Sequence, residues 1–352
     1  AEHLIACDGA RSPIRAALGL DFVGQLFEER FLIADITMKA DFPAERRFWF
    51  EPPFHEGQSA LLHKQPDDLW RIDLQLGPEA DPEAERRPET VIPRIRRIVG
   101  ERPFELDWVS VYSFQCRRLD RFRHGRVIFC GDSAHVVSPF GARGGNGGLQ
   151  DADNLAWKLA AVLRGEAPES LLDSYEAERI EAADENILNS ARATRFMTPE
   201  PGAERRYRDA VLDLAAHAPF ARSMVNSGRL SRPCTYSPNR WLGPDDDLLA
   251  PVSRPGAPAP DAPLPGGGWQ LHRLGGRFTL LAIGCEAPPL PGAAALTLPA
   301  TPELRARWLH DAASCVALIR PDQHVAARWT GAAYGPEAGA AALARALGRD
   351  AP

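Results

Sequence analysis

The residues best suited to chemistry lie in one stretch of the chain, residues 126–159. Residues 126–130 are an unbroken apolar run, as in a strand buried on both faces of a parallel sheet. Asp132 follows this strand, and a glycine-rich loop over residues 138–148 leads into a helical stripe of apolar residues that ends at Gly165. Ligands of open α/β sheets bind at the carboxyl ends of the strands, so this stretch predicts a ligand site.

The residue types in this stretch suit a flat ligand that carries hydroxyl groups and negative charge. A carboxylate at Asp132 can accept hydrogen bonds from sugar or ribityl hydroxyls, and glycines let backbone N–H groups approach a flat ring closely. The helix expected from about Gly145 directs its unpaired N–H groups and its positive end toward the loop. An anion there would be stabilised by about 0.3–1 kcal/mol. A reduced flavin, which is anionic at N1 and C2=O, meets these requirements.

The whole string resembles the second FAD fingerprint of the class A flavin-dependent aromatic hydroxylases, the group typified by p-hydroxybenzoate hydroxylase and phenol hydroxylase. The matching form is G-D-x-A-H, then P, then G-x-N-x-x-x-x-D-x-x-N-L-x-W-K-L. The resemblance implies that Asp132 contacts the ribityl chain and that Pro139 lines the flavin ring. It also implies that Gly144, Gly145 and Asn146 meet the pyrimidine edge. The structural alternative for Asp132 is a turn carboxylate that caps the next residues.

A shorter motif of the same family, D-G-x-x-S-x-x-R, begins at Asp8 and includes Ser12 and Arg15. In the family this aspartate is linked to both FAD and the nicotinamide donor, so the resemblance gives Asp8 and Arg15 a cofactor-binding role. The catalytic residues remain unknown at this stage, because no motif supports a role for His63, Trp70 or Arg71 in the expected substrate sheet.

Several other residues of the glycine-rich stretch have two interpretations each. His135 suits a core histidine as well as a site residue, and Asp151 suits a charge that complements the helix dipole as well as a functional group. One interpretation of Arg143 is that it steers substrate or a cofactor phosphate. The other is that it is a solvated loop arginine. We expect Trp157 and Lys158 to serve packing and the surface rather than chemistry.

Composition excludes several classes of protein and favours a soluble one. The 352 residues are 44% apolar and 25% charged, with a formal net charge of −6, so the chain offers no broad basic face to nucleic acid. No apolar run is long enough for a membrane span, and we expect a cytoplasmic protein. The six cysteines are widely spaced, without a C-x-x-C pair or a histidine at ligand spacing, so we expect reduced, mostly buried thiols and no metal site.

Periodicity and turn residues predict the secondary elements. Apolar–polar alternation between residues 31 and 76 favours a largely antiparallel sheet. A Pro- and Gly-rich segment, residues 254–268, favours a domain boundary. Strands are expected over residues 3–7, 31–38, 47–50, 59–64, 69–76, 108–117, 126–130, 277–283, 315–319 and 324–329. Helices are expected over residues 13–18, 90–99, 145–164, 171–196 and 336–347, with a polar loop over residues 78–88.

The fold class that follows is α/β, more fully α+β. With the resemblance it becomes an incomplete FAD-binding Rossmann-like domain, an inserted and mostly antiparallel substrate-binding sheet, a helical connection and a thioredoxin-like C-terminal domain that includes Arg320-Pro321-Asp322. The expected limits are residues 1–20 and 119–200 for the first part, 21–118 for the sheet, 201–254 for the connection and 255–352 for the last part. Because this last part lacks a C-x-x-C, no redox role is expected for it.

The family's G-x-G-x-x-G, which cradles the FAD pyrophosphate, is not found in this sequence. The chain opens on Ala-Glu-His-Leu-Ile-Ala-Cys, which reads as a strand inside a domain. We therefore expect the true N-terminus to lie upstream.

The resemblance implies an FAD- and NAD(P)H-dependent monooxygenase that hydroxylates a small phenolic or related aromatic substrate with molecular oxygen, through a C4a-hydroperoxyflavin, and it allows a homodimer. One alternative is a flavin-free fragment or binding module that keeps the fold without catalysis. Another is a flavoprotein of the wider superfamily that carries out a different oxidoreduction.

Overall fold

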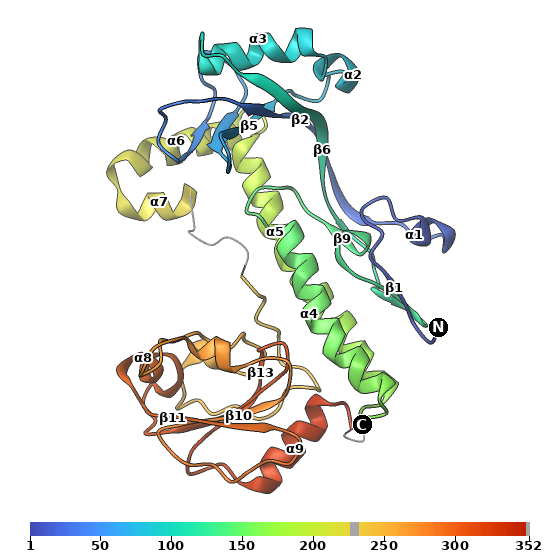
Figure 1. Cartoon of the computed structure of the whole chain (residues 1–352), viewed down its shortest axis with the longest axis vertical. Helices are drawn as coiled ribbons and strands as arrows, with labels where there is room; N and C mark the ends of the chain where they lie inside the picture. The colour runs from blue at the N-terminus through green and yellow to red at the C-terminus, as the bar shows by residue number, and fades with distance from the viewer. Residues whose placement is uncertain (226–231, 350–352) are drawn as a thin grey trace.

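The computed structural model describes residues 1–225 and 232–349. Its strands form three sheets, which lie at different levels along the long axis of the molecule (Figure 1). Two long helices, α4 (Gly144–Leu163) and α5 (Leu172–Met197), run through the middle and connect the upper sheet to the C-terminal part. Within the described residues no helix has the length and apolar character needed to cross a membrane.

The smallest sheet has the order β1-β8-β7 and contains the parallel strand pair expected before the glycine-rich loop. Its strands are β1 (Leu4–Ala6), β7 (Arg123–His124) and β8 (Val127–Phe129), and β1 pairs with β8 in parallel. Ile128 and Phe129 pack with Leu155 of α4 and Tyr175 of α5 in one buried cluster. The short helix α1 (Pro13–Ala17) follows β1 and is capped by Ser12, whose side chain accepts from the Arg15 backbone N–H.

The largest sheet is antiparallel throughout and has the order β3-β4-β5-β2-β6-β9. Alternate residues of its central strands, such as Leu32, Ala34 and Ile72, pack against Val91 and Ile95 of α3 and form the core of this part. Figure 1 shows α3 lying over that face. The elements are β2 (Val23–Thr37), β3 (Arg46–Trp49), β4 (Ala60–Lys64), β5 (Leu69–Gln75), α2 (Pro82–Glu85), α3 (Pro88–Val99), β6 (Glu105–Arg118) and β9 (His135–Val136).

The C-terminal sheet has the order β11-β10-β12-β13, in which β10 and β11 are parallel and the other pairs are antiparallel. Apolar clusters cover both of its faces. This parallel pair, antiparallel hairpin and closing helix agree with the expected thioredoxin-like fold. The elements are β10 (Thr279–Ile283), β11 (Ala294–Leu298), α8 (Pro302–Leu304), β12 (Cys315–Ile319), β13 (Val325–Thr330) and α9 (Pro336–Ala346).

The connection between the large sheet and the C-terminal part starts with two helices, α6 (Ala203–His217) and α7 (Pro219–Val225). Residues 232–250 are irregular, and the Pro- and Gly-rich segment then runs beside β13. The backbone N–H of Gly256 donates to the carbonyl of Val325 at 2.8 Å, and that of Ala259 donates to Gln323 at 2.8 Å. The segment therefore packs on the C-terminal sheet.

Three local expectations were wrong, two of them because pairing with another strand decides the outcome. The expected loop over residues 78–88 contains α2, which the Asp81 side chain caps at the Glu83 N–H. The strands β2 and β6 are longer than expected, because they pair with each other past a register shift between Leu26 and Arg30. Strand β11 was missed, since its short alanine-rich run gains its strand geometry from pairing with β10.

Gly24 gives a test of the long β2–β6 pair. Its φ is +131°, and a Cβ added there would lie 2.5 Å from the Cys116 carbonyl oxygen of β6. We expect Gly24→Ala to lower the free energy of unfolding by about 1–3 kcal/mol, because an L-residue is strained in this backbone region. Chemical denaturation would measure this. Gly145→Ala, in the first turn of α4 with open space, is the control, and equal stability of both variants would contradict the expectation.

Candidate flavin site

The two sequence motifs meet at one edge of the small sheet. Because β1 and β8 are parallel neighbours, Asp8 and Asp132 both lie beyond the carboxyl ends of their strands, on the same side. The Cys130 N–H donates to the Ala6 carbonyl at 3.0 Å, and the Arg15 guanidinium donates to the Ser133 carbonyl at 3.1 Å. The structure therefore brings together two motifs that are more than a hundred residues apart in sequence.

Local contacts hold Asp8 and Arg15 in place. The Asp8 carboxylate accepts from the Ser12 hydroxyl at 2.8 Å and from the Ile14 N–H at 3.1 Å. Slight burial works to raise its pKa, but these hydrogen bonds and the charge of Arg15 bring the pKa below the ordinary value. The Arg15 guanidinium lies 3.8 Å from the centre of the Phe22 ring. Asp8 is thus an exposed, ionised acceptor at the sheet edge.

Asp132 lies in a 3-10 turn, Gly131–Ser133, packed against the start of α4. The approach is close, because a Cβ on Gly148 would lie 3.3 Å from the Cα of Gly131. Glycine at position 148 lets the helix approach the turn that carries Asp132, whose side chain is exposed.

The first turn of α4 presents free backbone donors. Helix α4 begins at Gly144 without a side-chain cap, and the Gly147 N–H donates to Arg143 at 2.8 Å. The N–H groups of residues 144–146 precede that bond and have no partner within the helix. Gly145 and Asn146 are exposed, and a Cβ on Gly145 would meet nothing within 4 Å. This open end can receive a flat, negatively polarised group.

The loop before α4 touches one face of the large sheet. Pro139 is exposed, and the next residue, Phe140, lies 5.6 Å from Phe31 of β2 and 5.8 Å from Phe114 of β6, measured between ring centres. Ser138 is buried and accepts from the Thr194 hydroxyl of α5 at 2.8 Å. We call the side of the large sheet that carries Phe31 and Phe114 the inner face; it lies opposite the α3 side.

Asp151 is a buried anchor for the Asp132 turn. Its carboxylate accepts from the Gly131 N–H at 2.9 Å, contacts His135 Nε2 at 2.7 Å and accepts from Arg179 Nε at 2.6 Å. Burial alone would raise its pKa, but His135 and Arg179 bring the pKa below the ordinary value. His135 also stacks on Phe122 at 5.7 Å between ring centres, so it is a core histidine. Through these contacts Asp151 holds the turn and the loop in place, in addition to any interaction with the helix dipole.

Two expectations about charged residues were wrong. Arg143 is only 6% exposed and donates to Asn186 at 3.2 Å, so it is not a solvated loop arginine. Lys158 is completely buried, whereas Trp157 packs on Phe278 as expected, at 5.5 Å between ring centres. Both charged side chains are buried because partners on α5 satisfy them.

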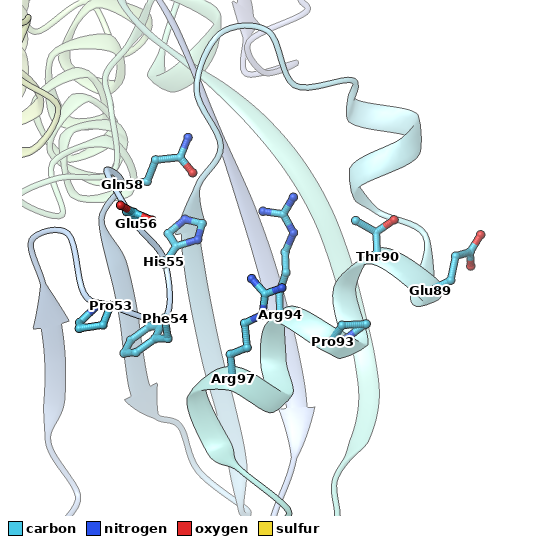
Figure 2. Close-up of a pocket in the computed structure, with 10 residues that line it drawn as sticks. All are labelled: Pro53, Phe54, His55, Glu56, Gln58, Glu89, Thr90, Pro93, Arg94 and Arg97. Carbon is cyan, nitrogen blue, oxygen red and sulfur yellow. The ribbon is translucent and has the colours of Figure 1, made fainter.

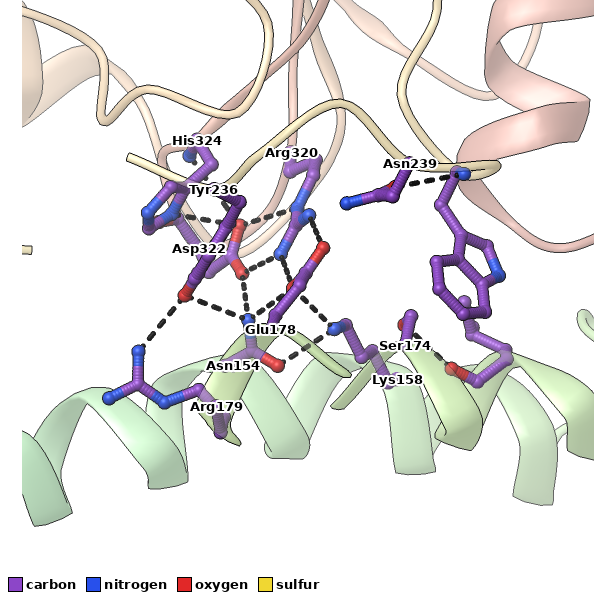
Figure 3. A network of polar contacts seen from close by, with 12 residues as sticks. Asn154, Lys158, Ser174, Glu178, Arg179, Tyr236, Asn239, Arg320, Asp322 and His324 are labelled. Atoms are coloured by element: carbon purple, nitrogen blue, oxygen red, sulfur yellow. Dashed lines mark hydrogen bonds and ion pairs between the residues drawn. The ribbon is translucent and has the colours of Figure 1, made fainter. Parts of the chain in front are cut away.

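Lys158 belongs to a buried network that joins α4 and α5 to the C-terminal part (Figure 3). Glu178 is its centre, with Lys158 Nζ at 2.8 Å and the guanidinium of Arg320 at 2.6 and 2.9 Å. Asp322 pairs with the same guanidinium and accepts from Asn154 at 3.2 Å. Burial would raise the pKa of Glu178, but Arg320 and Lys158 lower it to about 2. Burial also lowers the pKa of Lys158, to about 8, despite the nearby Glu178.

The network continues to the Asp132 turn. Tyr236 accepts from Asn154 Nδ2 at 3.4 Å and from Arg179 Nη1 at 3.0 Å (Figure 3), and Arg179 reaches Asp151. The sequence signal for it was present, since Asn154 and Lys158 have the i, i+4 spacing of one helix face. Their partners Glu178 and Arg320 are distant in sequence, so pattern alone did not identify them.

Two cavities lie away from this edge. One, of about 480 Å³, lies between the loop with His55 and the helix with Arg94 and Arg97 (Figure 2), on the α3 side of the large sheet. The other, of about 630 Å³, is lined by Asn154, Tyr236 and residues of the C-terminal part. Neither is lined by Asp132 or by the first turn of α4, so the candidate site is an open edge.

A parallel strand pair, two acidic turns and an open glycine-rich helix start define a nucleotide-cofactor site of the flavoprotein type. In agreement, residues 1–190 match the family described as FAD binding domain. The chain is 32% identical over 340 residues to the flavin-dependent monooxygenase of Mycobacteroides abscessus, covering 92% of this chain and 63% of that protein. It is 31% identical over 364 residues to the 12-dehydrotetracycline 5-monooxygenase/anhydrotetracycline 6-monooxygenase of Streptomyces rimosus, covering 98% and 69%.

Solved structures show the same fold. The rebeccamycin biosynthetic enzyme RebC with reduced flavin matches with a TM-score of 0.74 at 27% identity, over 99% of this chain and 69% of that one. The flavin-dependent monooxygenase PieE, in complex with FAD and substrate, matches in fold with a TM-score of 0.76 at 24% identity, over 99% and 70%. The chain belongs to the FAD-binding family of flavin-dependent monooxygenases and spans about two thirds of the length of these relatives.

The residues at the sheet edge fit the ring and ribityl parts of FAD. The open N–H groups of residues 144–146 suit the polar edge of an isoalloxazine ring, and Gly145 leaves space where a side chain would project. Exposed carboxylates at Asp8 and Asp132 suit ribityl hydroxyls. The contacts of Asp8, Arg15, Asp132, Pro139, Gly144, Gly145 and Asn146 with the cofactor stay predictions.

Glu178 tests the buried network. We expect Glu178→Gln to lower the free energy of unfolding by about 3–5 kcal/mol, because the positive charges of Lys158 and Arg320 then stay buried without the negative charge of Glu178. In the wild type the pKa of Glu178 is about 2 when folded and 4.5 ordinarily, so its stabilisation is present above pH 4.5 and is lost as the pH falls toward 2. Denaturation between pH 2 and 7 would measure both effects.

The control for this measurement is Glu101→Gln, since the Glu101 side chain is 99% exposed. That variant should match the wild type. An equally small effect of Glu178→Gln, or an unchanged pH dependence, would show that the network contributes little.

Proposed function

We propose that the protein is an FAD- and NAD(P)H-dependent monooxygenase that hydroxylates a phenolic or related aromatic compound. The observation that carries this is the meeting of Asp8, Asp132 and the uncapped start of α4 at one sheet edge. Bound FAD would supply the redox chemistry, with NAD(P)H as the reductant and molecular oxygen as the source of the added oxygen atom, by the route that the family resemblance implies.

The protein's own share is binding and orientation. In this proposal Asp132 and Asp8 accept hydrogen bonds from hydroxyls of the cofactor, and Pro139 lies against the ring. The first turn of α4 stabilises negative charge on the reduced ring by about 0.3–1 kcal/mol, and up to about 2 kcal/mol where it is partly buried. Phe31, Phe114 and Phe140 provide an apolar surface that excludes water from the side next to the large sheet.

The names of the relatives support an aromatic substrate. The Streptomyces rimosus relative is named for tetracycline intermediates, and a relative from Streptomyces glaucescens, 33% identical over 383 residues, is a tetracenomycin A2 monooxygenase-dioxygenase. Both substrate names denote fused-ring compounds. We therefore extend the proposal to a polycyclic aromatic substrate bound between the loop of Pro139 and the inner face.

Asp132→Ala tests the cofactor site. Loss of charge-assisted hydrogen bonds worth about 1.5–3 kcal/mol should weaken FAD binding by about 10- to 100-fold, because 1.4 kcal/mol is a factor of ten. Titration of the cofactor-free, full-length protein with FAD would measure the change. Asp120→Ala, at another exposed aspartate of the same part, should bind as the wild type does. Unaltered FAD affinity of Asp132→Ala would count heavily against the site.

Colour and isotope content separate the monooxygenase from its two alternatives. We expect the full-length protein to be yellow, with flavin absorption bands, and to place one atom of labelled oxygen in the product. A protein that stays colourless after incubation with FAD would be a flavin-free binding module. A yellow protein whose product carries no label would catalyse another oxidoreduction.

A further inference from the structure

The α3 side of the large sheet carries a pocket that the cofactor site does not use. It has a volume of about 480 Å³ and lies between α3 and the loop with His55, which connects β3 to β4 (Figure 2). The inner face, where Phe31 meets Phe140 of the glycine-rich loop, is the opposite side of this sheet. The pocket is therefore separate from the edge that fits the flavin.

Hydrogen bonds to β5 hold the loop that forms one wall of the pocket. His55 Nε2 donates to the Gln75 carbonyl at 2.6 Å, and the Ser59 N–H donates to the side-chain oxygen of Gln75 at 2.9 Å. Next to His55, the Phe54 ring packs edge-on against Trp49 of β3, at 5.3 Å between ring centres. Because the sheet already holds this wall in place, a ligand does not have to order it.

Helix α3 forms the opposite wall and places two guanidinium groups on it. Arg94 and Arg97 are three residues apart, so they are neighbours on one face of the helix. Figure 2 shows both side chains extending from α3 toward the loop, and His55 extending from the loop toward α3. Burial lowers the pKa of His55 and the two arginines lower it further, so the ring is neutral at pH 7. The positive charge of the pocket therefore lies on α3.

Arg97 supplies the open part of this positive charge. Glu85 pairs with Arg94 at 2.7 Å, whereas neither a carboxylate nor a carbonyl of the described residues pairs with the Arg97 guanidinium. A guanidinium carries five N–H donors in a planar fork, and a carboxylate can accept two of them side by side. An anion in the pocket therefore has donors available from Arg97.

The rest of the lining selects among anions. Two carboxylates, Glu56 and Glu89, also line the pocket and are exposed, and Figure 2 shows Glu89 near the start of α3, apart from the two arginines. They repel a phosphate dianion about twice as strongly as a singly charged carboxylate. Apolar surface from Pro53, Phe54 and Pro93 suits a ring attached to that carboxylate.

We propose that this pocket binds an aromatic carboxylate, with the carboxylate on Arg97 and Arg94 and the ring against Phe54 and Pro93. Its volume of about 480 Å³ lies in the range of small-molecule sites and accommodates a one-ring compound. The ligand contacts both walls, so it joins the loop to α3 and stabilises the folded protein by mass action. It occupies a second site, which can be filled while FAD is bound.

Benzoate tests the proposal in a ligand-observed NMR titration of the full-length protein with excess FAD. We expect Arg97→Gln to weaken benzoate binding at least tenfold, because it removes the charge-assisted hydrogen bonds to the carboxylate. Arg96→Gln is the matched control, since Arg96 is the adjacent arginine of the same helix and lies 5.7 Å from the centre of the Phe104 ring instead. That variant should bind benzoate as the wild type does.

Three results of this titration overturn the proposal. They are a wild type without saturable benzoate binding, an Arg97→Gln variant that binds as the wild type does, and an equal loss in both variants. The last result would show a general effect of surface charge.

Three further probes check the class of ligand. Benzamide has the shape of benzoate without its charge, and acetate has the charge without the ring, so both should bind at least fivefold more weakly than benzoate. Inorganic phosphate should also bind more weakly, because Glu56 and Glu89 repel the dianion. A probe of these three that binds as tightly as benzoate contradicts the aromatic carboxylate.

Stability and FAD affinity give controls that do not depend on catalysis. The Arg97 side chain is exposed, so Arg97→Gln should fold with the melting temperature and FAD affinity of the wild type. Benzoate should raise the melting temperature of the wild type and of Arg96→Gln, but not that of Arg97→Gln. A lower FAD affinity of Arg97→Gln would show that the two sites are not separate and would overturn the proposal.

Discussion

The structure depends on one buried carboxylate, Asp151, and on the donors that surround it. A charge removed from water is tolerated only where it is paired and hydrogen-bonded, and Asp151 has the Gly131 N–H, His135 and Arg179 around it. Those partners come from the turn before the glycine-rich loop and from α5. One interaction therefore fixes the turn that carries Asp132 relative to both long helices, and places the open start of α4 beside it.

The pairing of buried charges also links the C-terminal part to the candidate site. Glu178 needs the cations of Lys158 and Arg320, and Arg320 also needs Asp322 from its own part of the chain. Such buried networks are strongly destabilised by the loss of one member, so the two parts are held in a defined relation. The C-terminal part, which has no C-x-x-C, thus has a structural role, because it supplies Arg320 and Asp322 to the helices that support the glycine-rich loop.

Successive residues of each strand point to opposite sides of the large sheet, so its two faces differ in composition. Residues such as Leu32, Ala34 and Ile72 face α3 and form the core, whereas Phe31, Asp35 and Asp73, on the other side of the same strands, form the inner face. The side that faces α3 is covered by apolar residues. The inner face carries polar groups such as Asp35 and, along β6, the exposed rings of Trp108 and Tyr112, in keeping with the proposed aromatic substrate.

The sequence by itself determined the fold class, most strands and helices, and the family, because the glycine-rich stretch around Asp132 and the periodicity of its flanks are local patterns. It also indicated Asp8 and Arg15, but only parallel pairing of β1 with β8 places them beside Asp132. Tertiary structure decided the burial of Arg143 and Lys158, the network through Glu178 and Arg320, and the burial of Asp73 Oδ1 without a hydrogen-bond partner. Each depends on partners distant in sequence, and the cost of burying a charge or a polar group is set by those partners alone.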